Sequence, residues 1–351
     1  MKDIMNILKF NGKALAVAVL AAGLCSCSDW TSPEALDIAE GMQTASEVDL
    51  AAVRAFKQGE HKTVILGMDA TAATPVARYQ HLMSMPDSAD YIYIRNLVGG
   101  LHGSIVSEIA EVREKKGTKV LADIDYISVE NEWREMQDER MEAGEPTGTV
   151  EEFRTFCKER FEAQLECCDK FGCDGIMASY NGAASYEWAM AGRTAFINAV
   201  MDWYATHQSK TMFVRGTLAQ IPNATSGGVE QYDWKSFLKS CGLIVYPIGS
   251  ATTAGGLNIA VRRIYRGYED DFPLDRFVFE ATVPNPADPV QAGMPPAVAA
   301  AYVLIPDDRG DFSKLGLCVE NAQDDYFNIG NSYVNLRRAI TVLNTEPAQE
   351  S

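Results

Sequence analysis

Eight short apolar runs, separated by longer segments of helical period, most constrain how this chain can fold. Each run is rich in β-branched or aromatic residues and has the length of one buried strand. The runs are 63–68, 91–97, 119–124, 173–180, 211–217, 242–248, 276–283 and 314–320. Helical periods are found at 104–116, 149–171, 186–208, 232–240, 257–268 and 332–343. Eight strands with helical crossovers predict an α/β fold, a closed (β/α)8 TIM barrel, in preference to an open doubly wound sheet.

Two connections do not fit this alternation cleanly. The stretch 130–149 is long, charged and contains Gly and Pro, so it is either a functional loop with a short helix or a solvated insertion, and we favour the insertion. The connection after the seventh run is rich in proline, which leaves its helix the least defined.

The composition fits one large domain. The chain has 351 residues, of which 47% are hydrophobic, enough for a sizeable core. Its formal net charge of −17 argues against nucleic acid or an anionic membrane surface as a partner, and favours neutral or cationic ligands. Four scattered histidines and no paired Cys-x-x-Cys spacing argue against a zinc site, and nothing in the sequence calls for a cofactor.

The N-terminal segment is predicted to direct export. Three lysines precede an apolar run, 14–24, that is too short to span a bilayer. The run ends in Leu24-Cys25-Ser26-Cys27, which resembles the lipobox of bacterial lipoproteins with Cys27 as the acylated residue. We therefore expect a lipoprotein signal peptide at 1–26, a tether at 27–50 and the barrel at 51–345. Cleavage of an ordinary signal peptide, which releases a soluble secreted protein, is the alternative.

Barrel enzymes bind their ligands at the C-terminal ends of the strands, so the polar residues at these ends are candidate site residues. Carboxylates, amides and tyrosines there suit sugar hydroxyl and acetamido groups. The predicted ligand-binding residues are Asp69, Asn96, Asp125, Ser179, Tyr180, Asn181, Tyr246, Glu280, Glu320 and Asn321. Asp123, Arg215 and Asp324 lie at the same ends. Individually, such residues more often cap strands or pair with one another.

The fourth run reads Phe-Gly-Cys-Asp-Gly-Ile-Met-Ala-Ser-Tyr-Asn over residues 171–181. It resembles the fourth-strand signature of glycoside hydrolase family 18, the chitinases and endo-β-N-acetylglucosaminidases, in which Asp-Gly-x-Asp-x-Asp-x-Glu ends a barrel strand. Asp174 and Gly175 match that pattern, but the three later acidic places hold Met177, Ser179 and Asn181. Because strand side chains alternate with period two, these three should share the interior face of the barrel.

The resemblance implies a mechanism that these residues cannot perform. In that family the acetamido oxygen of the substrate attacks the anomeric carbon, the last Glu protonates the leaving oxygen, and the preceding Asp orients the acetamido group. Asn181 does not release a proton near neutral pH, and Ser179 cannot balance a developing positive charge. General acid catalysis alone contributes ~10²–10⁴ in rate, so the motif predicts no catalytic residue here and negligible hydrolysis.

The resulting expectation is a lipid-anchored, catalytically inactive protein that binds N-acetylglucosamine-containing glycans such as N-glycans. Its start resembles Bacteroidetes lipoproteins of this hydrolase group, which implies an outer-membrane location, on the cell surface or the periplasmic face, and an outer-membrane glycan import complex as partner. Two alternatives stay open. One is an active glycosidase that uses relocated carboxylates (Glu280, Glu320, Asp125). The other is a barrel kept for protein–protein contact with no sugar site.

Overall fold

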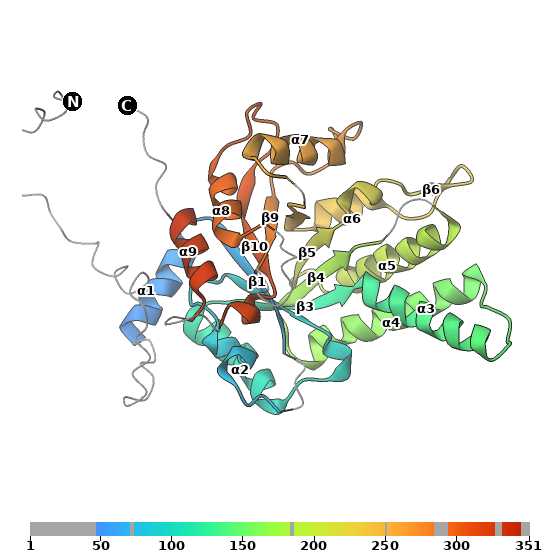
Figure 1. The fold of residues 1–351 in the computed structure, drawn as a ribbon, viewed down its shortest axis with the longest axis horizontal. Coiled ribbons are helices and arrows are strands. Elements are labelled where there is room, and N and C mark those ends of the chain that lie inside the picture. Colours follow the sequence, from blue (N-terminus) through green and yellow to red (C-terminus); the bar gives the residue numbers. More distant parts are fainter. Residues whose placement is uncertain are drawn as a thin grey trace, which may run out of the picture.

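A computed structural model describes residues 47–70, 74–182, 186–249, 251–283, 294–326 and 332–344. Its centre is a closed barrel of eight parallel strands in the order β1-β10-β9-β8-β5-β4-β3-β2, which confirms the predicted (β/α)8 fold (Figure 1). The predicted signal peptide, Cys27 and most of the predicted tether lie outside the described residues. The first described helix, α1 (Glu47–Gln58), begins within the stretch predicted as tether and buries Leu50 and Val53.

The barrel strands coincide with the eight predicted runs to within a few residues. They are β1 (Thr63–Asp69), β2 (Tyr91–Arg95), β3 (Lys119–Asp125), β4 (Gly175–Tyr180), β5 (Thr211–Gly216), β8 (Leu243–Pro247), β9 (Phe277–Thr282) and β10 (Lys314–Glu320). Parallel pairing runs around the ring and closes where β1 pairs with both β2 and β10. The last residues of all eight strands therefore meet at one end of the barrel, which we call the mouth.

Alternate strand residues divide the core into two parts, as period two requires. One part fills the barrel interior, with Ile65, Tyr93, Leu121, Met177, Phe213, Leu243, Val245, Val278 and Cys318. The other part lies between the strands and the surrounding helices and includes the outward residues of the same strands, such as Ile176 and Ala178 of β4. The interior is thus filled by side chains at the level of Met177 and offers no channel there.

The predicted helices are present as crossovers around the barrel (Figure 1). They are α2 (Gly103–Lys116), α4 (Val150–Lys170), α5 (Glu187–Thr206), α6 (Trp234–Ser240), α7 (Ala254–Tyr265) and α9 (Val334–Leu343). The proline-rich connection before β10 also contains a helix, α8 (Pro296–Leu304), which has proline in its first turn, where the missing N–H costs nothing.

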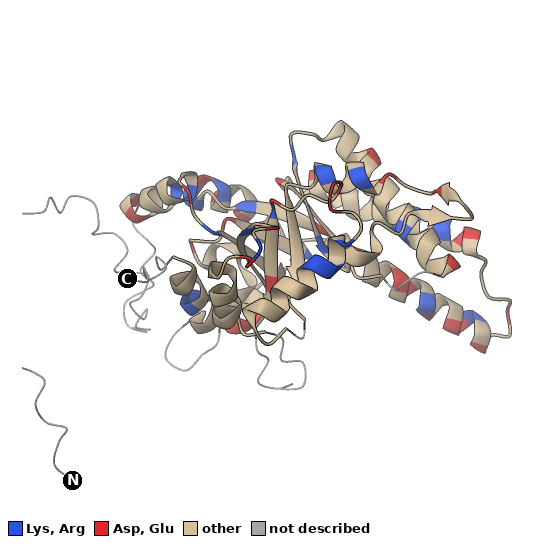
Figure 2. Cartoon of the chain, turned by 90° about the horizontal axis from the view of Figure 1, so that it is seen from above, with Lys and Arg blue, Asp and Glu red and all other residues tan. Residues whose placement is uncertain are grey.

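The prediction that residues 130–149 form a solvated insertion is wrong. Helix α3 (Tyr126–Glu142) fills much of it and packs along α4 to form an arm that extends away from the barrel (Figure 1). Tyr126, Val129 and Trp133 bury one face of α3, at the helical spacing of three and four. The outer face carries residues of both charges (Figure 2), which conceals this narrow apolar stripe in the sequence.

A second feature beside the barrel follows β5. A short hairpin of β6 (Thr225–Ser226) and β7 (Val229–Glu230) turns through Gly227 and Gly228, both at positive φ. Such a two-residue turn requires left-handed backbone, which glycine adopts without steric cost.

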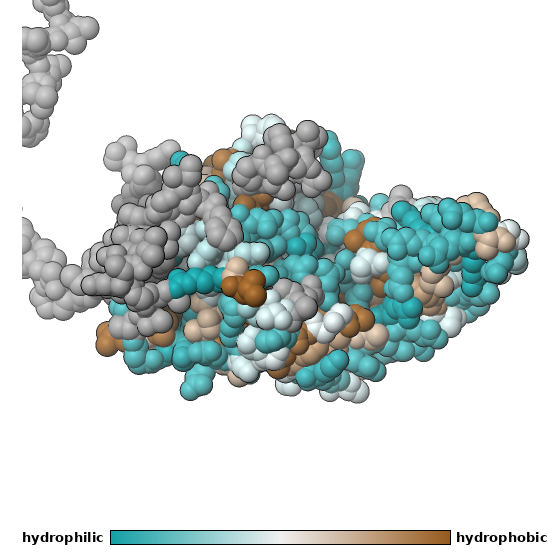
Figure 3. Space-filling model, turned by 60° about the horizontal axis from the view of Figure 1, so that its bottom comes forward, coloured by the Kyte–Doolittle hydropathy of each residue, from teal (hydrophilic) through white to brown (hydrophobic). Residues whose placement is uncertain are grey.

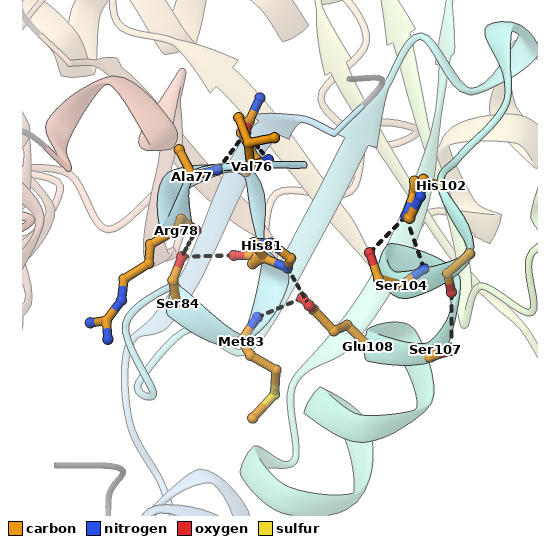
Figure 4. Close-up of polar contacts among 12 residues, drawn as sticks. Val76, Ala77, Arg78, His81, Met83, Ser84, His102, Ser104, Ser107 and Glu108 are labelled. Carbon is orange, nitrogen blue, oxygen red and sulfur yellow. Dashed lines mark hydrogen bonds and ion pairs between the residues drawn. The ribbon is translucent and has the colours of Figure 1, made fainter. Parts of the chain in front are cut away.

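The connection between β1 and β2 is held against α2 by polar contacts (Figure 4). His81 Nδ1 lies 2.5 Å from Glu108 Oε1, and the other carboxylate oxygen of Glu108 accepts the Met83 amide N–H at 3.1 Å. Ser84 Oγ donates to the carbonyls of Arg78 and His81. Glu108 therefore ties this long connection to α2, the helix that follows β2.

Six cysteines lie in the described part of the chain, and all are buried free thiols: Cys157, Cys167, Cys168, Cys173, Cys241 and Cys318. No helix of the described ranges is both long enough and apolar enough to cross a membrane. The face shown in Figure 3 has its apolar residues in separate small patches between hydrophilic ones.

Candidate functional site

The interior face of β4 carries two of the three residues that stand in the acidic places of the motif. Met177 is fully buried within the apolar interior of the barrel. Ser179, one step nearer the mouth, is also fully buried, and its hydroxyl donates to Asp123 of β3. Asn181 follows the end of the strand and is exposed, with its Oδ1 over Gly216. The expectation that residues 177, 179 and 181 share the interior face is thus met for Met177 and Ser179. It is not met for Asn181, which lies beyond the last residue of β4 and is exposed.

Arg215 of β5 is the central group of the mouth. Its Nε and Nη2 donate to the two oxygens of Glu280 at 2.7 Å and 3.0 Å. Nη2 also donates to Glu320 Oε1 at 3.0 Å. A guanidinium fork matches a carboxylate in this bidentate way, and the pair is charge-assisted. Arg215 therefore joins β5 to β9 and β10 across the interior.

The network extends to β2 through a second arginine. Arg95 Nη1 lies 3.7 Å from Glu320 Oε1, and Arg95 Nη2 donates to Asn321 Oδ1 at 2.6 Å. Beneath it, the guanidinium of Arg215 lies 5.4 Å from the ring centroid of Tyr93, within range of a cation–π contact. A Cβ on Gly67 would lie 2.2 Å from that ring, so glycine is needed at 67 to admit Tyr93.

Asp123 is a buried carboxyl group among these charges. Burial raises its pKa to about 7, although Arg215 and the hydrogen bond from Ser179 favour the ionised form. Nearby Asp125 also has a raised pKa, again because burial disfavours its charge. Its carboxylate caps α3 by accepting the Ile127 N–H at 3.1 Å, which gives Asp125 a structural role at the mouth.

Two asparagines with left-handed backbone follow the strands on either side of β1. Asn96 follows β2 and Asn321 follows β10, and both have left-handed backbone, with φ of 60° and 55°. The Asn96 amide donates to Asp69 Oδ2 at 3.0 Å. Asn and Asp tolerate this conformation better than other non-glycine residues. These contacts bring Asp69, Asn96, Glu280, Glu320 and Asn321 together at the mouth, as the sequence predicts.

Tyr180 and Tyr246 require a correction, because their side chains face away from the interior. Tyr180 packs against Tyr126 and Phe196, and its hydroxyl accepts from Arg193 Nη1 at 3.2 Å. Tyr246 packs against Phe279 in the outer part of the core. Each lies one residue out of phase with the interior positions of its strand.

Asp174 also has a structural role. It lies before the first residue of β4, at the end opposite the mouth. Its Oδ2 accepts the Val120 N–H at 2.8 Å, and its Oδ1 pairs with Arg113 Nε at 2.6 Å. The Asp-Gly of the motif thus ties β4 to β3 and α2. Gly175 is needed because a Cβ there would lie 1.9 Å from the Thr211 carbonyl oxygen.

Three groups of this network were not among the predicted ligand-binding residues. Arg95 and Tyr93 of β2 face the interior, and Arg215 was noted only as a strand-end residue. Period two along Tyr91, Tyr93 and Arg95 is the signal that points to them. Within the described ranges, no three His, Cys, Asp or Glu side chains are grouped so as to hold a metal ion.

A separate pocket of about 350 Å³ lies at the end of the barrel opposite the mouth. Its lining includes Thr63, Tyr91, Lys210 and Phe213, near the starts of their strands. None of the predicted ligand-binding residues contributes to it.

Comparisons with known proteins agree with this geometry. The family model described as glycoside hydrolase family 18, BT1044-like, matches residues 31–232. No curated protein matches the chain. A solved structure of a BT1044 variant is similar at 14% identity and a TM-score of 0.56, over 86% of this chain and 94% of that one.

An endo-β-N-acetylglucosaminidase from Cordyceps militaris is similar in its apo form, at 12% identity and a TM-score of 0.55, over 86% of this chain and 98% of that one. A variant of that enzyme in complex with fucosyl-N-acetylglucosamine-Asn is similar at 13% identity and a TM-score of 0.54, with coverage of 86% and 98%. At these identities the structures show the shared fold alone. The family model covers more than half of the chain, and the chain belongs to the BT1044-like group of glycoside hydrolase family 18.

Proposed function

We propose that this chain binds N-acetylglucosamine-containing glycans at the barrel mouth and does not hydrolyse them. One observation carries the proposal: the interior face of β4, which bears the acids in the resembled motif, holds Met177 and Ser179 in full burial. Asn181 is the exposed residue at the end of that strand, and an amide supplies no proton to a leaving oxygen. The scaffold is kept and the proton donor is missing.

The ion pairs at the mouth weigh against the alternative of relocated carboxylates. A retaining glycosidase needs two carboxyl groups ~5–5.5 Å apart with the anomeric centre between them. Glu280 and Glu320 are near neighbours, since both contact Nη2 of Arg215 at 3.0 Å. The guanidinium occupies the space between them, and both oxygens of Glu280 already accept its hydrogen bonds. Asp125, the third candidate, caps α3.

The ligand class is drawn from the chemistry of the mouth and from similar proteins. Amide and carboxylate groups of Asn96, Asn181, Asn321, Asp69 and Glu320 offer the donors and acceptors that sugar hydroxyl and acetamido groups require. Similar solved structures include an endo-β-N-acetylglucosaminidase, one variant of which holds fucosyl-N-acetylglucosamine-Asn. The proposed location follows from the lipobox-like Cys27: a lipid anchor in the outer membrane, beside a glycan import complex.

Calorimetry and product analysis on the full chain test the proposal together. N-acetylglucosamine oligosaccharides and an N-glycan should release heat on binding, while mass spectrometry of the same mixtures finds no cleaved product. Cleavage that disappears in Glu280→Gln or Glu320→Gln would establish the relocated-carboxylate alternative. Absence of binding to every such glycan would leave the protein–protein alternative. For the anchor, Cys27→Ala should abolish incorporation of a radiolabelled fatty acid.

A further inference from the structure

Acidic groups outnumber basic ones at the mouth. Around it lie six carboxyl groups, Asp69, Asp123, Asp125, Glu280, Glu320 and Asp324, and two guanidinium groups, Arg95 and Arg215. Asp324 is on the short helix η7 (Ala322–Asp325) after β10, close enough to Arg95 for their charges to interact. Asp123 is partly protonated near pH 7, because burial raises its pKa to about 7. The other carboxylates carry negative charge, and charges of one sign gathered at one site repel an approaching anion.

The two guanidinium groups are already engaged from within the protein. The side chain of Arg215 is 6% exposed and shared by Glu280 and Glu320. Arg95 is 25% exposed, and its two terminal nitrogens contact Glu320 and Asn321. An anionic ligand would therefore have to displace a carboxylate to reach Arg215. Arg95 is held less firmly, by an amide hydrogen bond and one long ion pair, and its Nε has no hydrogen-bond partner among the described residues.

A further basic residue of the described ranges, Arg78, lies at the rim of the mouth. Arg78 is exposed on η2 (Arg78–Gln80), which packs beside η7 at the rim. The stretches of sequence between residues 47 and 344 that the structure does not describe contain one charged residue, Asp288, and no Lys or Arg. The excess of acidic groups is thus not offset by the sequence of those stretches.

From this distribution we infer that the mouth selects uncharged glycan segments and rejects sulfated or sialylated ones. The inference rests on the proposed function and narrows its ligand to neutral saccharides. Selection is electrostatic, so it weakens as salt shortens the range of the carboxylate charges.

A matched pair of ligands tests this inference: an N-acetylglucosamine oligosaccharide and the same oligosaccharide carrying 6-O-sulfate. Dissociation constants of both are measured at about 0.01 M and about 1 M salt, where the Debye length is about 30 Å and about 3 Å. At low salt we expect the sulfated ligand to bind about threefold more weakly or worse, and at high salt we expect the ratio to approach one. A sialylated N-glycan and its asialo form provide a second pair.

Asp324→Asn removes one rim charge at nearly constant shape and should reduce the low-salt ratio. The matched control is Glu60→Gln, an exposed acid in the connection before β1, at the opposite end of the barrel, which should leave the ratio unchanged. Equal or tighter binding of the sulfated ligand, lost in Arg95→Gln, would overturn the inference and leave the proposed function standing. A preference that persists at high salt and in Asp324→Asn would show steric selection and also overturn it. If neither ligand binds, the proposed function fails, and the inference with it.

Discussion

Arg215 holds the mouth together at the scale of single residues, because Glu280 and Glu320 share its guanidinium. Replacing it in Arg215→Met leaves Glu280, which is 7% exposed, without a counter-charge. Loss of one partner from a buried ion pair costs about 3–5 kcal/mol, so we expect the free energy of unfolding to fall by that amount. Urea denaturation measures it.

A matched control for Arg215→Met is Lys158→Met on α4. Lys158 pairs with Glu162 one helical turn away, and the two side chains are 63% and 52% exposed, so its loss should change the unfolding free energy by about 0.5 kcal/mol or less. The double variant Arg215→Met with Glu280→Gln should recover part of the loss. If Arg215→Met were as mild as the control, the ion pair would contribute nothing to stability.

Asp123 gives the unfolding free energy a dependence on pH. Its pKa is about 7 in the folded chain against an ordinary value of 3.8, so between these values the folded state binds more protons than the unfolded state. Stability must then decrease as pH rises through this window, by up to about 4 kcal/mol for this group alone.

Asp123→Asn should flatten that decline between about pH 4 and about pH 7, because the variant has no proton to lose. Urea unfolding across the window checks it. Asp138→Asn, an exposed acid on α3, serves as the control and should retain the wild-type slope. The assignment is wrong if the two variants show the same pH profile.

At the scale of elements, the arm depends on how α4 begins. Thr149 Oγ1 accepts the Glu152 N–H at 3.2 Å, and Glu152 Oε2 accepts the Thr149 N–H at 2.6 Å, which together form a capping box. Thr149→Ala should lower the free energy of unfolding by about 1 kcal/mol. Thr155→Ala, at an exposed position within the same helix, should change it by less than about 0.5 kcal/mol.

Hydrogen exchange locates where the effect of Thr149→Ala appears. If the arm opens independently of the barrel, Thr149→Ala should speed hydrogen exchange in α3 and in the first turns of α4. The free energy of global unfolding should then stay unchanged. Unchanged exchange together with unchanged stability would show that the capping box is not needed.

At the scale of the whole molecule, a ligand at the mouth should stabilise the barrel against unfolding. Seven of the eight barrel strands supply the residues that meet there, all except β8, so the site exists only while the barrel is closed. An N-acetylglucosamine oligosaccharide at 100 times its dissociation constant should raise the unfolding free energy by about 2.7 kcal/mol. A cello-oligosaccharide, which lacks acetamido groups, is the control. Equal stabilisation by both sugars would remove the basis for acetamido recognition.

Features that depend on residues close together in the sequence could be predicted from it, whereas features that depend on residues far apart could not. The barrel and the interior position of Met177 and Ser179 follow from local periodicity and were predictable. Tyr180 and Tyr246 were assigned from their place at strand ends, although the same period two turns them outward. The Arg215 network joins residues 65 and 105 positions apart, and no local pattern encodes such pairs. Helix α3 was missed because its apolar stripe is sparse among charged residues.

Because all six described cysteines are buried free thiols, the rate at which each one reacts with a thiol reagent reports how often the fold opens around it. They lie on α4, beside β4 and β8, and inside β10, so each thiol becomes reactive only when its own element separates from the core. A thiol reagent added to the native protein would label each cysteine at the rate at which its surroundings open. Mass spectrometry of the labelled peptides would then rank the parts of the barrel by how often they come apart, without changing a single residue.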